Sequence, residues 1–186
     1  MSASPRWKQR PEGSTWGERL ESVAAALMVA CLAVFACAGL AHAQVVALGA
    51  SQTYGKGVDR SQSYPSQLEA MLRAKGQNVR VENAGINGDT TGGMLGRLDG
   101  AVPNGTRVVI LQPGGNDMRK GSEASRGANI SAIVQRLNAR HIRVIMLENG
   151  NFRGLPRQTD GVHLTPEGYR AIAQRLLPQV VSAIGR

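Results

Sequence analysis

The stretch Val45-Val46-Ala47-Leu48-Gly49-Ala50-Ser51 decides the fold class. Its apolar residues fill successive positions and do not alternate with polar ones, which is typical of a parallel strand buried on both faces. The run closes on glycine and leads into a hydroxyl side chain. Ligand sites of open α/β folds lie at the carboxyl ends of the strands, so we expect Ser51 at that edge. A serine there is either a turn or helix-capping residue or a nucleophile.

Strand and helix patterns alternate along the rest of the chain. They predict further strands at residues 79–83, 107–111 and 142–147, and helices at residues 64–75, 92–98, 123–140 and 165–177. The strand at 79–83 alternates apolar and polar residues, so we expect it at the sheet edge. The last helix is expected to end before Pro178. Alternating strands and helices imply a parallel sheet within a three-layer α/β/α sandwich.

Residues 1–43 are expected to lie outside this fold. A polar lead containing four positive charges precedes the apolar segment Val23 to Leu40 and the small-residue triplet Ala41-His42-Ala43. These are the three parts of a secretory signal peptide, so we predict a signal peptide over 1–43 and one catalytic domain over 44–186. The predicted location is secreted or periplasmic. An uncleaved leader that anchors the chain in the inner membrane is the alternative, since the apolar run is almost long enough to span a bilayer.

Composition excludes several classes of function. Both cysteines, Cys31 and Cys37, lie in the predicted leader, so the remaining chain has no disulfide framework and no thiol catalysis. The net charge of +9 comes mostly from scattered arginines and not from the clustered basic face that nucleic-acid binding requires. It is compatible with weak association with an anionic membrane surface. We expect no cofactor, and the two separated histidines that follow the predicted leader offer no metal-ligand cluster.

One short turn carries a carboxylate and an imidazole. Serine hydrolysis needs a base for the hydroxyl proton, an acid that orients the base, and donors for the oxyanion. Asp160 precedes His163 by three residues, so its carboxylate can reach Nδ1 and leave Nε2 for Ser51. The alternative is an ordinary Asp-Gly turn beside a surface histidine. The other histidine, His141, falls between a helix end and a strand start, at the opposite sheet edge, and is expected to interact with the helix C-terminus.

Two further loops offer donors for an oxyanion. They are the backbone N–H of Gly88 and the side-chain amide of Asn116, although Asn87-Gly88 and Gly115-Asn116 are also common turn dipeptides. A parallel sheet brings the loops after its strands to one edge. Four separate loops would therefore each supply a different part of one reaction at one place, and this coincidence favours the functional interpretation.

Four blocks of the chain resemble, in order, the motifs of the SGNH/GDSL hydrolases: Gly49-Ala50-Ser51, residues 83–90, Gly114-Gly115-Asn116-Asp117, and residues 160–165. The resemblance extends from Val45 to about Pro178. It implies a flavodoxin-like parallel sheet of four to five strands and ester hydrolysis through an acyl-enzyme. The implied roles are Ser51 as nucleophile, His163 as base, Asp160 as orienting acid, and Ser51 N–H, Gly88 N–H and the Asn116 amide as oxyanion hole.

The chain departs from the family pattern in two places. Ala50 stands where the family usually has an aspartate, whose carboxylate helps to fix the nucleophile loop. Only twelve residues separate Leu147 from Asp160, a segment that is usually longer in the family's thioesterases and includes a fifth strand. Arg153 and Arg157 in this short connection either meet an anionic substrate or are solvated loop charges.

Together these observations predict a serine esterase whose partner is a small-molecule ester. Within the family, the chain is similar to small secreted bacterial arylesterases and thioesterase/lysophospholipases. Small or aryl carboxylic esters are the expected substrates, with acyl thioesters or lysophospholipids as further classes. Two alternatives stay open: a carbohydrate O-deacetylase that uses the same residues, and a catalytically silent binding module of the same fold, which Ala50 and the shortened connection favour.

Overall fold

The computed structural model describes residues 45–185. The predicted leader and its cleavage site therefore lie outside the described residues, and so does the boundary between residues 43 and 44. Within the described range, no helix combines the length and the apolar character that crossing a membrane requires.

A single parallel sheet has the strand order β2-β1-β3-β4. Its strands are β1 (Val45–Gly49), β2 (Val81–Gly85), β3 (Val108–Gln112) and β4 (Arg143–Met146). The expected parallel sheet is confirmed, with four strands within the described residues. The second strand lies at the sheet edge as predicted, although it begins two residues later than the pattern indicated.

Strand β1 lies between β2 and β3 and is buried along its whole length. Side chains alternate across a strand, so Val45 and Ala47 enter the core on one face while Val46 and Leu48 enter the core on the other. Both cores are apolar. This two-sided burial explains why β1 has no polar side chain.

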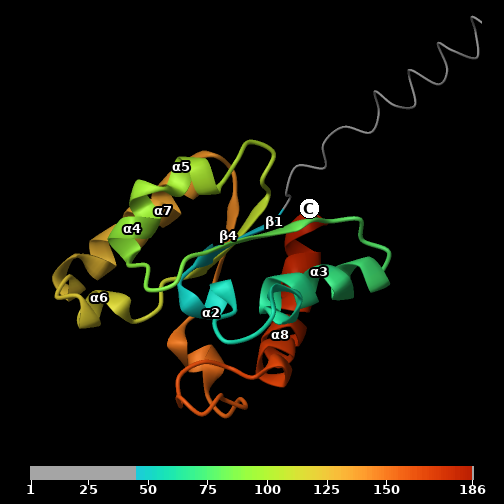
Figure 1. Cartoon of the computed structure of the whole chain (residues 1–186). Coiled ribbons are helices and arrows are strands. Elements are labelled where there is room, and N and C mark those ends of the chain that lie inside the picture. Colours follow the sequence, from blue (N-terminus) through green and yellow to red (C-terminus); the bar gives the residue numbers. More distant parts are fainter. Residues whose placement is uncertain (1–44, 186) are drawn as a thin grey trace, which may run out of the picture. The chain divides into compact units, whose positions relative to one another are not determined.

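Helices cover both faces of the sheet and complete the predicted three layers (Figure 1). In Figure 1, α3 and α8 lie to the right of the sheet, whereas α4, α5 and α7 lie to its left. The longer helices are α3 (Tyr64–Ala74), α7 (Glu123–Ala139) and α8 (Pro166–Ile184). The shorter elements are α2 (Ser51–Tyr54), η1 (Arg60–Gln62), α4 (Thr91–Gly96), α5 (Leu98–Ala101), α6 (Asn116–Arg119) and η2 (Asn149–Phe152).

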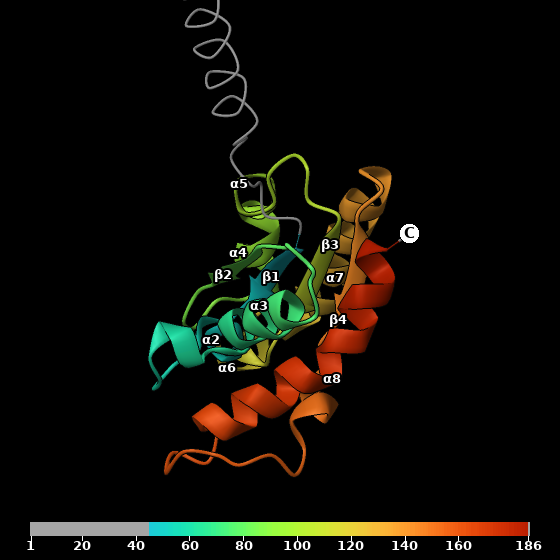
Figure 2. The same ribbon diagram turned by 90° about the vertical axis from the view of Figure 1, so that its right-hand side faces the viewer.

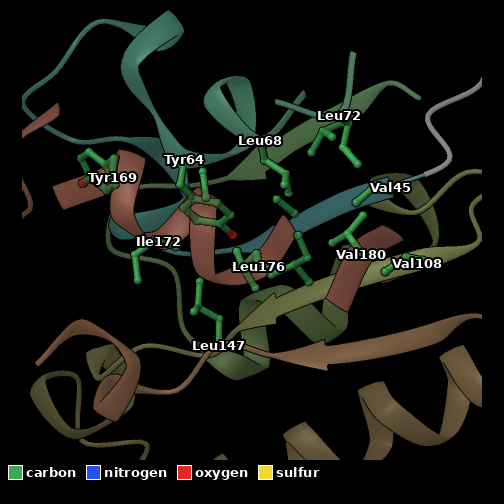
Figure 3. Close-up of a cluster of buried hydrophobic side chains, with 14 of the residues drawn as sticks. Val45, Tyr64, Leu68, Leu72, Val108, Leu147, Tyr169, Ile172, Leu176 and Val180 are labelled. Carbon is green, nitrogen blue, oxygen red and sulfur yellow. The ribbon is translucent and has the colours of Figure 1, made fainter. Parts of the chain in front are cut away.

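Figure 3 shows the core beneath α3 and α8. Leu68 and Leu72 of α3 and Leu176 and Val180 of α8 pack there against the side chains of β1 and β3, and all four are almost completely buried. Each buried aliphatic side chain contributes about 1.5–3 kcal/mol relative to an exposed one. This packing holds α8 against the sheet, and α8 directly follows the loop containing Asp160 and His163.

Two helix predictions were wrong. The helix predicted at 92–98 is two short helices, α4 and α5, which meet at Arg97. The predicted end of the last helix before Pro178 is also wrong, because α8 continues to Ile184. Proline removes one backbone hydrogen bond, but the buried stripe of α8 continues on both sides of it with Leu176, Val180 and Ile184. Burial of that stripe outweighs the local cost, and Figure 2 shows the helix changing direction along its length.

Candidate active site

The candidate site lies where the strand order reverses. Chain order runs outward from β1 to β2 on one side and to β3 and β4 on the other, which opens a crevice at the carboxyl ends of β1 and β3. Ser51 is the first residue of α2, directly after β1, and Asn116 is the first residue of α6, after β3. Parallel topology thus brings together two of the predicted site residues that are far apart in the sequence.

Glycine at the end of β1 lets the nucleophile loop turn back onto the sheet. A Cβ atom on Gly49 would stand 2.2 Å from Thr53 Oγ1, a position that no side chain can occupy. Similarly, a Cβ on Gly85 of the neighbouring strand would stand 2.2 Å from the backbone nitrogen of Tyr54. Helix α2 therefore packs directly on the strand backbones, and this contact places Ser51 above the sheet edge.

Ser51, His163 and Asp160 form one chain of hydrogen bonds. The distance from Ser51 Oγ to His163 Nε2 is 3.0 Å, and that from His163 Nδ1 to Asp160 Oδ2 is 2.5 Å. A carboxylate can only accept, so Nδ1 carries the proton and Nε2 accepts from the serine hydroxyl. The predicted reach of Asp160 to the imidazole is present in the structure, and the alternative of a surface histidine does not hold, because His163 is only 7% exposed.

The carboxylate of Asp160 is stabilised in its charged form. Its hydrogen bond with the His163 side chain is the main cause, followed by backbone N–H groups of His163 and Val162, which donate to Oδ1 at 2.9 and 2.8 Å. Together they hold the pKa of Asp160 well below its usual range. The carboxylate is thus ionised at neutral pH and keeps the imidazole in one orientation.

The loop that carries Asp160 and His163 is fastened through the carbonyl oxygen of Val162. This oxygen accepts from Gln52 Nε2 at 2.8 Å and from Arg157 Nη1 at 2.5 Å. Arg157 also donates to the Phe152 carbonyl at 3.1 Å. Arg157 was expected either to meet an anionic substrate or to be a solvated loop charge. The structure shows a third arrangement, in which its guanidinium donates to backbone carbonyls and holds the site loop.

Asn116 has a fixed amide orientation. Its Nδ2 donates to the carbonyl oxygen of Asp89 at 2.7 Å, and its Oδ1 accepts from Arg119 Nη2. A carbonyl can only accept and a guanidinium can only donate, so these partners assign the two ends of the amide without ambiguity. Asn116 is 5% exposed and lines the same pocket as Ser51, as the prediction of a shared site requires.

Gly88 lies in the loop after β2, where it adopts a positive φ of 73°. The loop is joined to β1 by the bond from the Ile86 N–H to the Gly49 carbonyl, and to Asn116 through Asp89. Asp89 also forms an ion pair with Arg97 at 2.8 Å. Gly88 itself is not among the residues that line the pocket at Ser51. The structure therefore places its loop beside the site, and the role of its N–H stays a prediction.

Gln112, a residue that sequence reasoning missed, supports the nucleophile loop. Its Oε1 accepts from the Ala50 backbone N–H at 3.0 Å and from Thr53 Oγ1 at 3.2 Å. Thr53 Oγ1 in turn shares a hydrogen bond with the hydroxyl of Tyr64, whose pKa is raised above its usual range by burial. A polar residue that ends the otherwise apolar strand β3 was the available signal, since Gln112 pairs with Gly49 in the sheet.

The pocket beside Ser51 has a volume of about 350 Å³. Its wall is mainly apolar or neutral. It is lined by Ala50, Ser51, Gln52, Gln112, Gly114, Gly115, Asn116, Met118, Arg119, Asn149 and Val162. No group of three His, Cys, Asp or Glu side chains suited to a metal occurs between residues 45 and 185.

The sequence profile of the GDSL-like Lipase/Acylhydrolase family matches residues 47–159, well over half of the chain. The chain belongs to this family. The matched segment of this GDSL-family chain contains Ser51, Gly88 and Asn116 and ends one residue before Asp160. The predicted family resemblance is confirmed.

Two curated proteins are similar in sequence. Esterase TesA of Pseudomonas aeruginosa is 32% identical over 126 residues, which is 66% of this chain and 63% of that protein. The arylesterase of Vibrio mimicus is 31% identical over 122 residues, 63% of this chain and 61% of that protein. The chain thus aligns with somewhat under two thirds of the length of both relatives.

A solved structure supports the fold. The crystal structure of a protein named TesA superimposes with a TM-score of 0.65 at 23% identity, covering 72% of this chain and 96% of that one. At this level of identity the likeness concerns the fold alone. The GDSL-family chain therefore has the α/β architecture that the motif resemblance implied.

Proposed function

We propose that the chain is a serine esterase that hydrolyses small or aryl carboxylic esters. The observation that carries the proposal is the hydrogen-bonded series Ser51–His163–Asp160, in which Ser51 lines the pocket at the carboxyl ends of β1 and β3. Two relatives bear the names esterase and arylesterase, which supports the same reaction class. Acyl thioesters and lysophospholipids are further substrate classes that the same groups could hydrolyse.

In the first half of the reaction, Ser51 Oγ attacks the ester carbonyl carbon while its proton passes to Nε2 of His163. The negative charge of Asp160 stabilises the imidazolium that forms. His163 then returns the proton to the leaving alcohol as the carbon–oxygen bond breaks, which leaves an acyl ester on Ser51. Water repeats the sequence, and the products are the carboxylic acid and the free serine.

The oxyanion of the tetrahedral intermediate needs donors that are already in place. The proposed donors are the backbone N–H of Ser51, the backbone N–H of Gly88 and the amide of Asn116. An amide has two N–H groups, and the Asp89 carbonyl takes one of those on Asn116. Each donor typically lowers the barrier by about 3 kcal/mol.

Ser51→Ala tests the assignment directly. We expect loss of p-nitrophenyl acetate hydrolysis and of fluorophosphonate labelling, with an unchanged circular dichroism spectrum. Ser131→Ala is the matched control, because Ser131 lies on the exposed side of α7, away from the pocket. Unchanged turnover in the Ser51 variant would overturn the proposal.

The same preparations separate the two alternatives. A carbohydrate O-deacetylase would release acetate from acetylated glycans faster than from aryl esters, whereas the proposed esterase would show the opposite order. A silent binding module would neither hydrolyse esters nor react with the fluorophosphonate. The intact series of three hydrogen bonding side chains supports an active enzyme over a silent module.

We further propose that residues 1–43 direct export and are then removed. The charged lead, the apolar segment and the Ala41-His42-Ala43 triplet support this proposal. Expression of the full chain in a Gram-negative host, followed by N-terminal sequencing of the periplasmic protein, is expected to give a sequence that starts at Gln44. Recovery of the intact leader in the membrane fraction would favour the anchored alternative.

A further inference from the structure

The pocket beside Ser51 carries a single charged side chain. Of its eleven lining residues, only Arg119 is charged, and none is acidic. Arg119 lies at the end of α6, the short helix that begins with Asn116. Any substrate that fills this pocket therefore meets one positive charge close to the proposed oxyanion donor.

Arg119 is held at the pocket by its hydrogen bond to Asn116 Oδ1. A guanidinium has five N–H groups, so this bond leaves most of its donor capacity unspent. Between residues 45 and 185, the acidic side chains on the loops around the site have other partners, and Glu148, beside the pocket residue Asn149, pairs with Arg126 at 3.7 Å. Asp89 pairs with Arg97 at 2.8 Å, Asp160 pairs with His163 at 2.5 Å, and Asp117 accepts from Thr91. No carboxylate in this range forms an ion pair with Arg119, so its charge is not neutralised locally.

A second cation, Lys120, lies beside the loop after β2. A Cβ atom placed on Gly88 would have Lys120 Nζ as its neighbour at 3.9 Å. Lys120 directly follows Arg119, so the end of α6 places one cation in the pocket and one beside the loop after β2. Two positive charges in a partly enclosed site attract anionic ligands and raise the local concentration of those ligands.

The remainder of the pocket offers apolar contact. Met118 is 67% exposed and Val162 is 42% exposed, and both line the pocket. These two side chains add apolar surface to the pocket wall, which a ligand in the pocket can cover. The lining thus suits a ligand that has a short apolar body and a negative group.

We infer that the site prefers esters that carry a carboxylate near the scissile bond, with Arg119 as the specificity-determining residue. The inference rests on the proposed esterase function and leaves its chemistry unchanged. A guanidinium recognises a carboxylate through paired, charge-assisted hydrogen bonds, which a neutral ester group cannot replace. The negative group can belong to the acyl part or to the leaving alcohol, and separate substrate pairs distinguish these two sources.

Two matched pairs of substrates test the inference. For the acyl side, the mono-p-nitrophenyl ester of glutarate is compared with its methyl ester, which has similar length but no charge. For the leaving side, 4-acetoxybenzoate is compared with methyl 4-acetoxybenzoate. The measured quantity is the ratio of kcat/KM for the charged substrate to that for the neutral one. Hydrolysis of the neutral members by the wild-type protein tests the proposed function separately.

Arg119→Gln removes the charge and is expected to lower this ratio about three- to tenfold in at least one pair. Arg119 also orients Asn116, but loss of that role slows both members of a pair and cancels in the ratio. Arg119→Lys should retain much of the preference, and Arg119→Gln combined with Lys120→Gln should abolish it. The preference should also weaken towards about 1 M salt, where the screening length is about 3 Å.

Arg136→Gln is the matched control, because it removes one positive charge from the exposed end of α7. Its ratio should equal that of the wild type. An equal fall in the Arg119 and Arg136 variants would mean attraction by net charge alone and would overturn the inference. An unchanged ratio in Arg119→Gln, with neutral esters still hydrolysed, would overturn it as well while leaving the esterase proposal intact.

Discussion

Gln52 Nε2 donates a hydrogen bond to the carbonyl oxygen of Val162 at 2.8 Å. This bond joins α2, which begins with Ser51, to the loop that carries Asp160 and His163. It is the most direct link between the two halves of the proposed catalytic series apart from the Ser51–His163 bond itself. The oxygen of the same side-chain amide, Gln52 Oε1, is buried without a hydrogen-bond partner.

Gln52→Ala is therefore expected to reduce activity more than stability. Loss of the link lets His163 move relative to Ser51, so kcat should fall about tenfold with little change in KM. Stability should change little, because the substitution also removes the unpaired Oε1 acceptor. Steady-state kinetics, the rate of fluorophosphonate labelling and urea unfolding measure these effects. Gln135→Ala, on the exposed side of α7, is the control. A labelling rate equal to that of the wild type would contradict this role.

Gln112→Leu should impair both stability and activity. Leucine has nearly the same size but leaves the Ala50 N–H and the Thr53 hydroxyl without their acceptor in a buried site. An unsatisfied buried polar group costs about 1–3 kcal/mol, so we expect a loss of this size in the free energy of unfolding. Thr53→Val removes one of the two donors and should cost less. If both variants unfold at the wild-type urea concentration, Gln112 does not support the loop.

Asp160 should make stability depend on pH in the acidic range. Its folded-state pKa lies below the ordinary value of 3.8, so its charged form stabilises the folded chain. This contribution is complete above the unfolded-state pKa and is lost as the pH falls through the folded-state pKa. The stability difference between wild type and Asp160→Asn should therefore be constant from about pH 5 upwards and shrink below about pH 4. Urea unfolding across this range measures it, with exposed Asp99→Asn as control. A difference that grows in acid would contradict the assignment.

His141→Gly should stabilise the fold. His141 has a φ of 56°, the one non-glycine residue between 45 and 185 with a positive φ. Together with the bond from the Ile142 N–H to the Leu137 carbonyl, it ends α7 in the turn that usually contains glycine. Relief of the backbone strain, less the extra entropy of unfolded glycine, should yield about 0.5–1 kcal/mol.

His141→Ala separates backbone strain from side-chain loss, since alanine keeps the Cβ atom and should give no gain. Urea unfolding of both variants at neutral pH provides the comparison. A gain of equal size with alanine would mean that the imidazole itself is unfavourable at the end of α7. A loss with both variants would instead support the predicted interaction of His141 with the helix C-terminus.

The sequence predicted the structure best at positions where the proposed reaction requires a particular residue type. The order and spacing of the four blocks predicted which loops meet, and the three-residue offset predicted that Asp160 reaches His163. Apolar runs, and an alternating pattern for β2, predicted each strand to within about two residues. Gly49 marked the end of the first strand, and the structure adds the reason for glycine there, since a Cβ atom would stand 2.2 Å from Thr53 Oγ1.

Contacts between polar side chains and distant backbone were not predictable in the same way. Gln52 carries no pattern of its own, since glutamine is equally common on solvated surfaces. Gln112 is marked only as the polar end of an apolar strand, and tertiary structure alone assigns the partners of both residues. Arg157 could be read from sequence only as a charge, although its function in the fold is to hold the Val162 carbonyl. Pro178 led to a wrong prediction of the end of α8. The local signal of proline is strong, but burial of side chains along α8 outweighs it.

The hydrogen bond from the Ala50 N–H to Gln112 has a consequence for how family members are recognised from sequence. The backbone N–H of Ala50 is held by a side chain 62 positions further along the sequence, in a chain whose first block has no carboxylate. A pattern that insists on aspartate before the serine would pass over a chain built in this way. A pattern that pairs a small residue before the serine with an amide at the end of the third strand would recover it. A sequence search for such chains should therefore combine the residues at the ends of β1 and β3, and should not rely on one tripeptide at the serine.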